Sequence, residues 1–158
     1  MNRGTITLLK SGIYLIGIVL LVLCIFWLPW LAGEASIMNP EYAYLRYPVL
    51  IGLYVTAIPF FLALYQALKL LDYIKTKNAF SDLAVGKLNH IKHYAIIITL
   101  FYISGGFGLF LQSALHPGIA IIGIVIIFAS LTISLFAALL QELLRNALEI
   151  KSENDLMI

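Results

Sequence analysis

Residues 66–94, QALKLLDYIKTKNAFSDLAVGKLNHIKHY, form the one long interior stretch in which charged side chains recur, and they separate two apolar halves of the chain. Five of the ten Lys and Arg residues lie in this stretch: Lys69, Lys75, Lys77, Lys87 and Lys92. Basic residues close to the ends of membrane spans resist translocation, so a basic stretch between apolar segments is typical of a cytoplasmic connection. The stretch therefore predicts a connector, residues 72–90, between two pairs of spans.

The composition indicates that lipid surrounds most of the chain. Of the 158 residues, 62% are hydrophobic and 11% are charged, whereas soluble domains carry about 25% charged residues. A hydrocarbon core of about 30 Å requires about 20 apolar residues in a helix. The chain is long enough for four such helices and leaves no room for a separate soluble domain. The net charge of +2 gives no support for direct binding of nucleic acid.

Two spans are predicted before the connector. The first, residues 12–31, is longer than the apolar part of a signal peptide, and we expect the mature protein to retain it. Residues 33–47 contain Asn39-Pro40 and three tyrosines, and they predict a loop or a loop with one short interfacial turn. The tyrosines fit an aromatic belt or an outward-facing recognition surface. Pro48 begins the second span, residues 48–71, which Pro59 interrupts as a kink or a hinge.

Two further spans are predicted after the connector. Residues 93–141 contain no Asp, Glu, Lys or Arg, and a straight helix of this length would measure about 74 Å. The chain must therefore turn, and Leu115-His116-Pro117-Gly118 divides spans at residues 91–112 and 119–140. Small residues four apart let helices approach closely. We expect Ser104 and Gly108 of one span to pack against the small residues of the other, which are Ser130, Ser134 and Ala138.

The connector contains a helix start, and the end of the chain extends beyond the last span. Ser81 is a strong N-cap candidate, with Asp82 at the positive end of the following helix and Phe80 placed for a hydrophobic staple. Residues 141–158 predict a cytoplasmic extension: an apolar stripe continues the helix against the connector, and a short acidic tail begins at Ser152.

The basic residues determine the predicted orientation. With both termini cytoplasmic, nine of the ten Lys and Arg residues lie inside and Arg46 alone lies outside. The sequence thus predicts an all-α, multi-pass protein of a plasma membrane, a four-transmembrane-helix bundle with cytoplasmic termini.

The sequence contains no pattern that indicates an enzyme, a cofactor or a metal site. No acid, Lys or Arg lies at the middle of a span, which argues against an ion path. His90 and His93 could share a helix face, but a metal site requires more ligands, and we interpret them as interfacial polar residues. Cys24 is the only cysteine and is interpreted as a small apolar packing residue.

Two short motifs resemble a bacterial family of small four-span membrane proteins, catalogued as domain of unknown function 2975. FSDLAVGKLNHI, residues 80–91, is similar to the family's F-S-x-x-N-V-x-x-L connector, and IKSENDLMI, residues 150–158, to its I-K-x-E-N-D-L-T-I ending. Ala84 and Met157 depart from the pattern, where Asn and Thr are common. The resemblance implies a plasma-membrane protein with no enzymatic activity, often encoded beside a small helix-turn-helix regulator.

The resemblance suggests that the connector and the end of the chain form a cytoplasmic face that holds such a regulator. The candidate residues for binding it are Lys75, Lys77, Phe80, Ser81, Lys87, Glu149, Lys151, Glu153, Asn154 and Asp155. A simpler reading is that these charges anchor the spans and contact lipid headgroups. A rival function is a small transport or immunity protein that binds a peptide or a lipophilic molecule near Pro59 and residues 105–108. The lipid bilayer is the one partner common to all these readings, and the sequence is compatible with a homo-oligomer.

Overall fold

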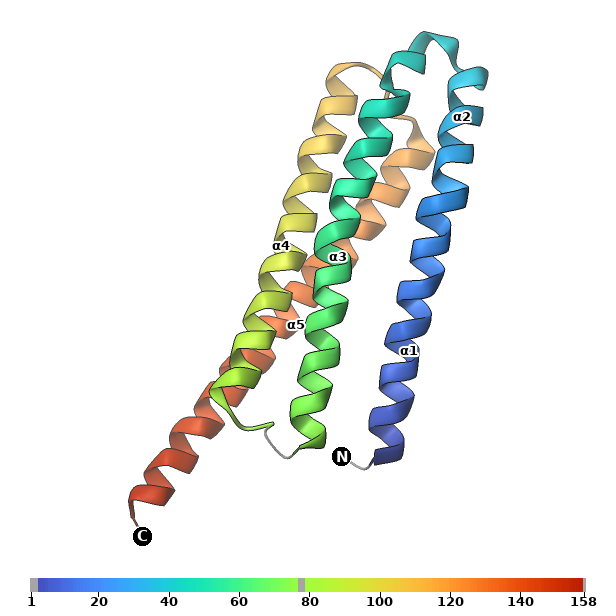
Figure 1. Ribbon diagram of the computed structural model, residues 1–158. Helices are drawn as coiled ribbons and strands as arrows, with labels where there is room; N and C mark the ends of the chain where they lie inside the picture. The colour runs from blue at the N-terminus through green and yellow to red at the C-terminus, as the bar shows by residue number, and fades with distance from the viewer. Residues whose placement is uncertain (1–2, 77–78, 158) are drawn as a thin grey trace.

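The computed structural model describes residues 3–76 and 79–157, which form four long helical segments (Figure 1). Each segment is long and apolar enough to cross a membrane: Arg3–Met38, Pro40–Lys75, Asp82–Leu111 and Pro117–Leu156. The prediction of an all-α chain with four spans is therefore confirmed. Figure 1 places both termini and the turn between the second and third segments at one end of the molecule.

The first segment is a single rod composed of three elements. Helix α1 (Arg3–Val22) passes into one π-helical stretch, η1 (Leu23–Trp27), and then into α2 (Leu28–Met38). The loop predicted from residue 33 is therefore wrong over residues 33–38, which are helical. The helix ends at Asn39, where φ is −131° and ψ is 73°, because the residue before a proline is pushed out of the α region.

A short turn connects α2 to the second rod. The 3-10 helix η2 (Pro40–Leu45) supplies the interfacial turn that the sequence offered as an alternative. Helix α3 (Arg46–Lys75) begins two residues earlier than predicted, so Pro48 lies within its first turn. Prolines are tolerated there because the first four N–H groups of a helix have no intrahelical acceptor. The helix continues through Pro59.

The second half is an antiparallel pair of long helices. Helix α4 (Asp82–Leu111) ends in a turn in which Ala114 donates its backbone N–H to Leu109 and Ser113 donates to Phe110. Helix α5 (Pro117–Leu156) starts at the predicted turn, with the His116 imidazole Nδ1 accepting from the Gly118 N–H at 3.0 Å. The acidic tail predicted from Ser152 is instead helical through Leu156. The 40 residues of α5 span about 60 Å, twice the hydrocarbon thickness.

The most extensive packing joins α4 and α5, and small or hydroxylated side chains form it. Ser130, Ser134 and Ala137 of α5 are buried, as are Ala95 and Thr99 of α4. Thr99 and Ser130 join their hydroxyls at 2.7 Å, and Thr99 also donates to the Ala95 carbonyl at 2.9 Å. These contacts fix the register of the two helices, because an unpaired hydroxyl in a lipid-facing bundle lacks water as a partner.

The predicted packing of small residues is confirmed for α5 and wrong for α4. Ser130 and Ser134 do pack against α4, but Ser104 is exposed, and a Cβ atom added at Gly108 would meet nothing within 4 Å. Helix α5 crosses the bundle obliquely (Figure 1). The close contact therefore falls one to two turns nearer the end that carries the termini, at Ala95 and Thr99.

Candidate functional site

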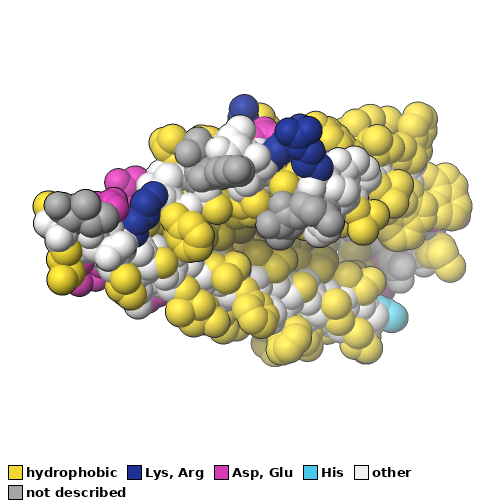
Figure 2. All heavy atoms as spheres, turned by 90° about the horizontal axis from the view of Figure 1, so that it is seen from below, with side chains coloured by type: hydrophobic (Ala, Val, Ile, Leu, Met, Phe, Trp, Pro, Cys, Tyr) yellow, Lys and Arg dark blue, Asp and Glu magenta, His cyan; other side chains and the backbone are white. Residues whose placement is uncertain are grey.

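The charged end of the molecule is the candidate site. It comprises the described residues of 3–10, 69–92 and 141–157, which lie at the end shared by both termini (Figure 1). Figure 2 looks onto this end, where Lys, Arg, Asp and Glu side chains interrupt a surface that is otherwise largely hydrophobic. Eight of the nine basic residues predicted for this side are described here: Arg3, Lys10, Lys69, Lys75, Lys87, Lys92, Arg145 and Lys151.

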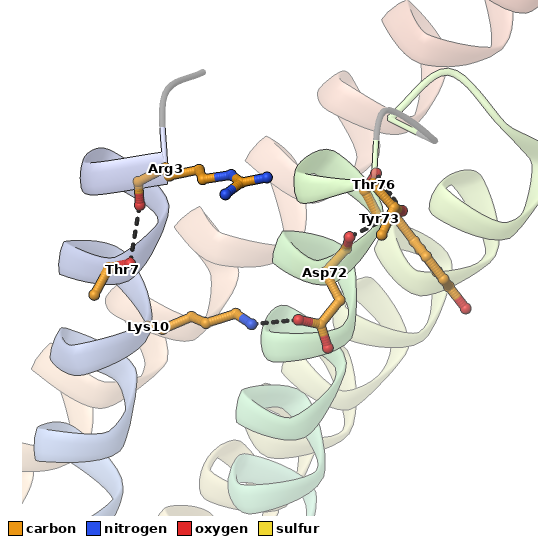
Figure 3. Close-up of polar contacts among 6 residues, drawn as sticks. All are labelled: Arg3, Thr7, Lys10, Asp72, Tyr73 and Thr76. Atoms are coloured by element: carbon orange, nitrogen blue, oxygen red, sulfur yellow. Dashed lines mark hydrogen bonds and ion pairs between the residues drawn. The ribbon is translucent and has the colours of Figure 1, made fainter.

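An ion pair joins the first two rods at this end. The Lys10 ammonium of α1 donates to the Asp72 carboxylate of α3, and the side chain of Arg3 also extends from α1 toward α3 (Figure 3). Asp72 lies one residue past the predicted span 48–71. The hydrogen bond from Lys10 holds the pKa of the Asp72 carboxyl below its ordinary value of 3.8, with smaller contributions from the charges of Lys69 and Lys75 and some opposition from desolvation. This pair was not predicted from the sequence. The feature that could have indicated it is Asp72, the one acid of α3, which lies between Lys69 and Lys75.

The connector itself is short because helices occupy most of it. Of the predicted residues 72–90, those up to Lys75 belong to α3 and those from Asp82 belong to α4. Ser81 is the N-cap as predicted: it is extended, with φ −145° and ψ 157°, and its Oγ accepts from the Ala84 N–H at 3.3 Å. Phe80 is 58% exposed. Lys77 lies outside the described residues.

A buried amide ties α5 to α4 at the charged end. Gln141 is 6% exposed, and its Oε1 accepts from the Lys92 ammonium at 3.1 Å while its Nε2 donates to Asn89 Oδ1 at 3.3 Å. A buried amide is stable only where both of its polar atoms are paired, so these bonds fix where α5 leaves the membrane-spanning part of the fold. Ala84 and Leu88, one to two turns further out on α4, are also buried.

The last turns of α5 project beyond this contact. In the antiparallel register set by Gln141 and Asn89, residues 144–148 lie opposite the first two turns of α4, and Leu144, Ala147 and Leu148 are half-buried. Every residue from 149 to 157 is exposed. The predicted contact between this extension and the connector is therefore confined to 141–148. Residues 149–156 form a free helix end, hereafter the projecting end (Figure 1).

The two histidines of α4 have local partners. His93 Nδ1 lies 2.7 Å from the Asn89 carbonyl oxygen, so this nitrogen carries the proton and donates. His90 stacks on Tyr94, with ring centroids 6.4 Å apart. Within residues 3–76 and 79–157, no three His, Cys, Asp or Glu side chains are close enough to share a metal ion.

The tyrosines of η2 connect the two turns at the opposite end. Tyr42 donates its hydroxyl to the Ser113 carbonyl at 2.8 Å, and Tyr44 donates to Gln112 Oε1 at 2.7 Å. Both hydroxyls thus bind the turn between α4 and α5. Tyr47 is 62% exposed and lies beside the Arg46 guanidinium, 5.1 Å from ring centroid to Cζ.

The comparison with known proteins agrees with this architecture. The model of a family described as Protein of unknown function (DUF2975) matches residues 30–158. The chain belongs to this family. It is also 51% identical over 160 residues to the uncharacterized membrane protein YoaS of Bacillus subtilis (strain 168), and the match covers all of both chains. No solved structure matches the chain.

Membership of the DUF2975 family confirms the resemblance drawn from the two motifs, and the protein is a membrane protein. The structure separates these motifs. The connector motif begins at Phe80 and caps α4, whereas the ending motif, from Ile150, occupies the projecting end. Of the predicted partner-binding residues, Lys75, Phe80, Ser81 and Lys87 lie on or beside the connector, and Glu149, Lys151, Glu153, Asn154 and Asp155 lie on the projecting end.

Proposed function

We propose that this member of the DUF2975 family is a non-enzymatic protein of the plasma membrane that holds a small helix-turn-helix regulator at its charged end, with both termini cytoplasmic. The observation that carries the proposal is the position of the family's ending motif. Ile150 is 67% exposed, Leu156 83% and Met157 86%, and none of the residues from 149 to 157 is buried by the rest of the described chain.

The charge of the projecting end supports a basic partner. Glu149, Glu153 and Asp155 lie in the last turns of α5, whereas the last turn contains no basic residue. The C-terminal end of a helix carries a partial negative charge, so acids there are unfavourable and a cationic surface beside them is favourable. A helix-turn-helix protein presents such a surface, because it binds DNA through basic residues. The contact would weaken at high salt.

Co-purification with the product of the neighbouring gene tests the tether. Replacing the three acids in Glu149→Gln, Glu153→Gln and Asp155→Asn should release the regulator, and so should deletion of residues 149–158. Glu34→Gln with Glu41→Gln removes acids at the opposite end and should retain it. Replacement of Phe80 by Ala and of Lys75 and Lys87 by Gln reports whether the connector contributes. A regulator that does not co-purify with the wild-type protein would rule out tethering, and one that stays bound after loss of both segments would rule out the charged end as its binding surface.

Cysteine labelling tests the orientation separately. Eight described basic residues lie at the charged end and Arg46 lies at the other, which favours a cytoplasmic charged end. After Cys24→Ala, a cysteine at Ser113 should react with a membrane-impermeant maleimide in intact cells, and a cysteine at Ser152 should react only after lysis. The reverse result would place the projecting end outside and remove the regulator from reach.

A binding cleft for a lipophilic molecule is the second candidate. A cleft of about 290 Å³ lies between α3 and α4 beside Pro59, and its walls are almost entirely apolar, including Val55, Ile97 and Phe101. Residues 105–108 are not among its walls. If the protein has a transport or immunity role, Ile97→Trp should fill this cleft and abolish the resistance of the cells to a toxic compound. The regulator should still co-purify with this variant.

A further inference from the structure

A second cleft lies between α1 and α3, directly on the membrane side of the Lys10–Asp72 pair. It has a volume of about 260 Å³, and its walls include Ile13, Tyr14 and Gly17 of α1 with Leu64, Tyr65 and Leu68 of α3. Helix α1 packs mainly against α3. The cleft is therefore open to the acyl chains of the bilayer, and its apolar walls suit a hydrocarbon chain.

Gly17 shapes the cleft. A Cβ atom at this position would lie 3.6 Å from Leu64 Cδ1 and 3.9 Å from Phe61 Cε1, at ordinary van der Waals distance. A larger side chain at position 17 would thus occupy the space between the two helices. By contrast, a Cβ atom at Gly123 of α5 would meet nothing within 4 Å, so Gly123 provides a matched position facing the lipid.

Positive charge gathers at the end of this cleft. The Lys69 ammonium lies over the Tyr65 ring, 5.4 Å from its centroid, and Tyr65 is itself a wall of the cleft. Lys10 extends from α1 toward α3 just outside the cleft, where Asp72 is the one acid among the residues drawn in Figure 3, and Arg3 lies about two turns further from the cleft. Lys10 is neutralised by Asp72, which leaves Lys69 to attract an anion.

The cleft beside Pro59 lacks this combination. The walls of both clefts lack Lys and Arg, but the Lys69 ammonium lies over Tyr65, a wall of the cleft between α1 and α3. Beside the other cleft, Lys92 lies two residues from the wall residue Tyr94 and is bound to Gln141. An apolar groove that ends at basic side chains, close to the membrane surface, matches a molecule with an acyl chain and an anionic headgroup.

We propose that the cleft between α1 and α3 binds one anionic phospholipid, with an acyl chain along Gly17 and Tyr65 and the phosphate beside Lys69. The lipid fills the space that these helices leave between them and draws them together at the charged end. The site requires neither a particular orientation of the protein nor a bound regulator, so it stands apart from the tethering function.

Native mass spectrometry of the full chain in detergent tests the site. Phosphatidylglycerol and phosphatidylcholine with identical chains are added in turn, and the bound lipid is counted. We expect one phosphatidylglycerol to bind more tightly than phosphatidylcholine. Lys69→Gln should weaken its binding about fivefold, the effect of one basic residue near a membrane surface. Lys151→Gln, the same change on the projecting end, should have no effect.

The chain-binding part of the site has its own control. Gly17→Leu should remove the bound phospholipid while Gly123→Leu retains it, and soluble glycerophosphate should not compete. Equal binding of both lipids, equal loss in the Lys69 and Lys151 variants, or displacement by glycerophosphate would overturn the proposal. Should Gly17→Leu fail to fold, the Lys69 comparison and the competition experiment decide it.

Discussion

The Tyr54 hydroxyl of α3 donates to the backbone carbonyl oxygen of Cys24 at 2.7 Å. This carbonyl lies in the π-helical stretch, where Leu28 donates its N–H to Leu23, five residues earlier. The next bond in that register would run from Pro29 to Cys24, and proline has no N–H to donate. Tyr54 therefore supplies the hydrogen bond that Pro29 cannot. It also joins the first rod to the second inside the lipid, where an unpaired carbonyl is costly.

Tyr54→Phe should destabilise the protein by about 1–2 kcal/mol, because the Cys24 carbonyl loses its partner. Unfolding in mixed micelles with increasing sodium dodecyl sulphate measures the change. Tyr14→Phe, at a side chain that is 59% exposed, should change the free energy of unfolding much less.

Replacing Pro29 distinguishes this explanation from a loss of packing. In a Pro29→Ala background the residue at 29 carries an N–H, so Tyr54→Phe should become nearly neutral. An equal cost in both backgrounds would show that the hydroxyl does not compensate for the proline.

Sequence reasoning located the four spans because their apolar runs are long and because a proline or a charged stretch separates them. It placed the end of the first helix too early. A loop was predicted from residue 33 because Asn39-Pro40 and three tyrosines break the apolar pattern, but residues 34–38 contain nothing that stops a helix before Asn39-Pro40. The π-helical stretch could not be predicted, because the partner of the Cys24 carbonyl is Tyr54, a residue 30 positions away.

A large side chain should be costly at small residues where α4 and α5 are in contact and tolerated at small residues outside that contact. Ser134 is 5% exposed against α4, so Ser134→Leu should force the helices apart and destabilise the protein by about 1–3 kcal/mol. Gly108→Leu should be tolerated, because nothing lies within 4 Å of its Cβ position. The same micelle titration measures both. A larger cost at Gly108 would indicate that α5 packs against the face of α4 that carries Ser104 and Gly108, as the sequence predicted.

The turn after α4 should gain stability from a glycine. Ser113 has φ of 55°, in the left-handed region that favours glycine. Ser113→Gly should stabilise the protein by about 0.5–1 kcal/mol, since Tyr42 binds the backbone carbonyl and not the side chain. Ser113→Ala retains the strain and serves as the control. A thermal shift in detergent should rise for the glycine variant alone, and a similar rise for alanine would contradict the role of backbone strain.

The Lys10–Asp72 pair should respond to pH in one direction. Its hydrogen bond lowers the pKa of the Asp72 carboxyl, so the stabilisation is fully present above 3.8 and is lost as pH falls through the lower folded value. The side chain of Asp72 is 46% exposed, so the effect is modest. Asp72→Asn should be less stable than the wild type at pH 7, and the difference should shrink as pH falls below 3.8. Asp155→Asn should match the wild type throughout, and a difference for Asp72→Asn that did not shrink with falling pH would point to packing instead.

The candidate site was less predictable than the spans. Local signals sufficed for Ser81, because an N-cap requires only its own helix. The Lys10–Asp72 pair and the bonds of Gln141 to Lys92 and Asn89 join residues about 50 to 60 positions apart. Such bonds depend on the relative register of two helices, which apolar periodicity does not specify.

The boundary between packed and projecting residues of α5 should appear in truncated chains. Removal of residues 149–158 deletes only exposed residues among those described, so the midpoint of thermal unfolding in detergent should change little. Removal of residues 141–158 also deletes Gln141 and the half-buried Leu144 and Leu148. That truncation leaves Lys92 without its acceptor and uncovers Leu88, and it should lower stability by at least about 2 kcal/mol. A large loss from the shorter deletion would mean that the projecting end packs against the bundle, and it would remove the free surface on which tethering depends.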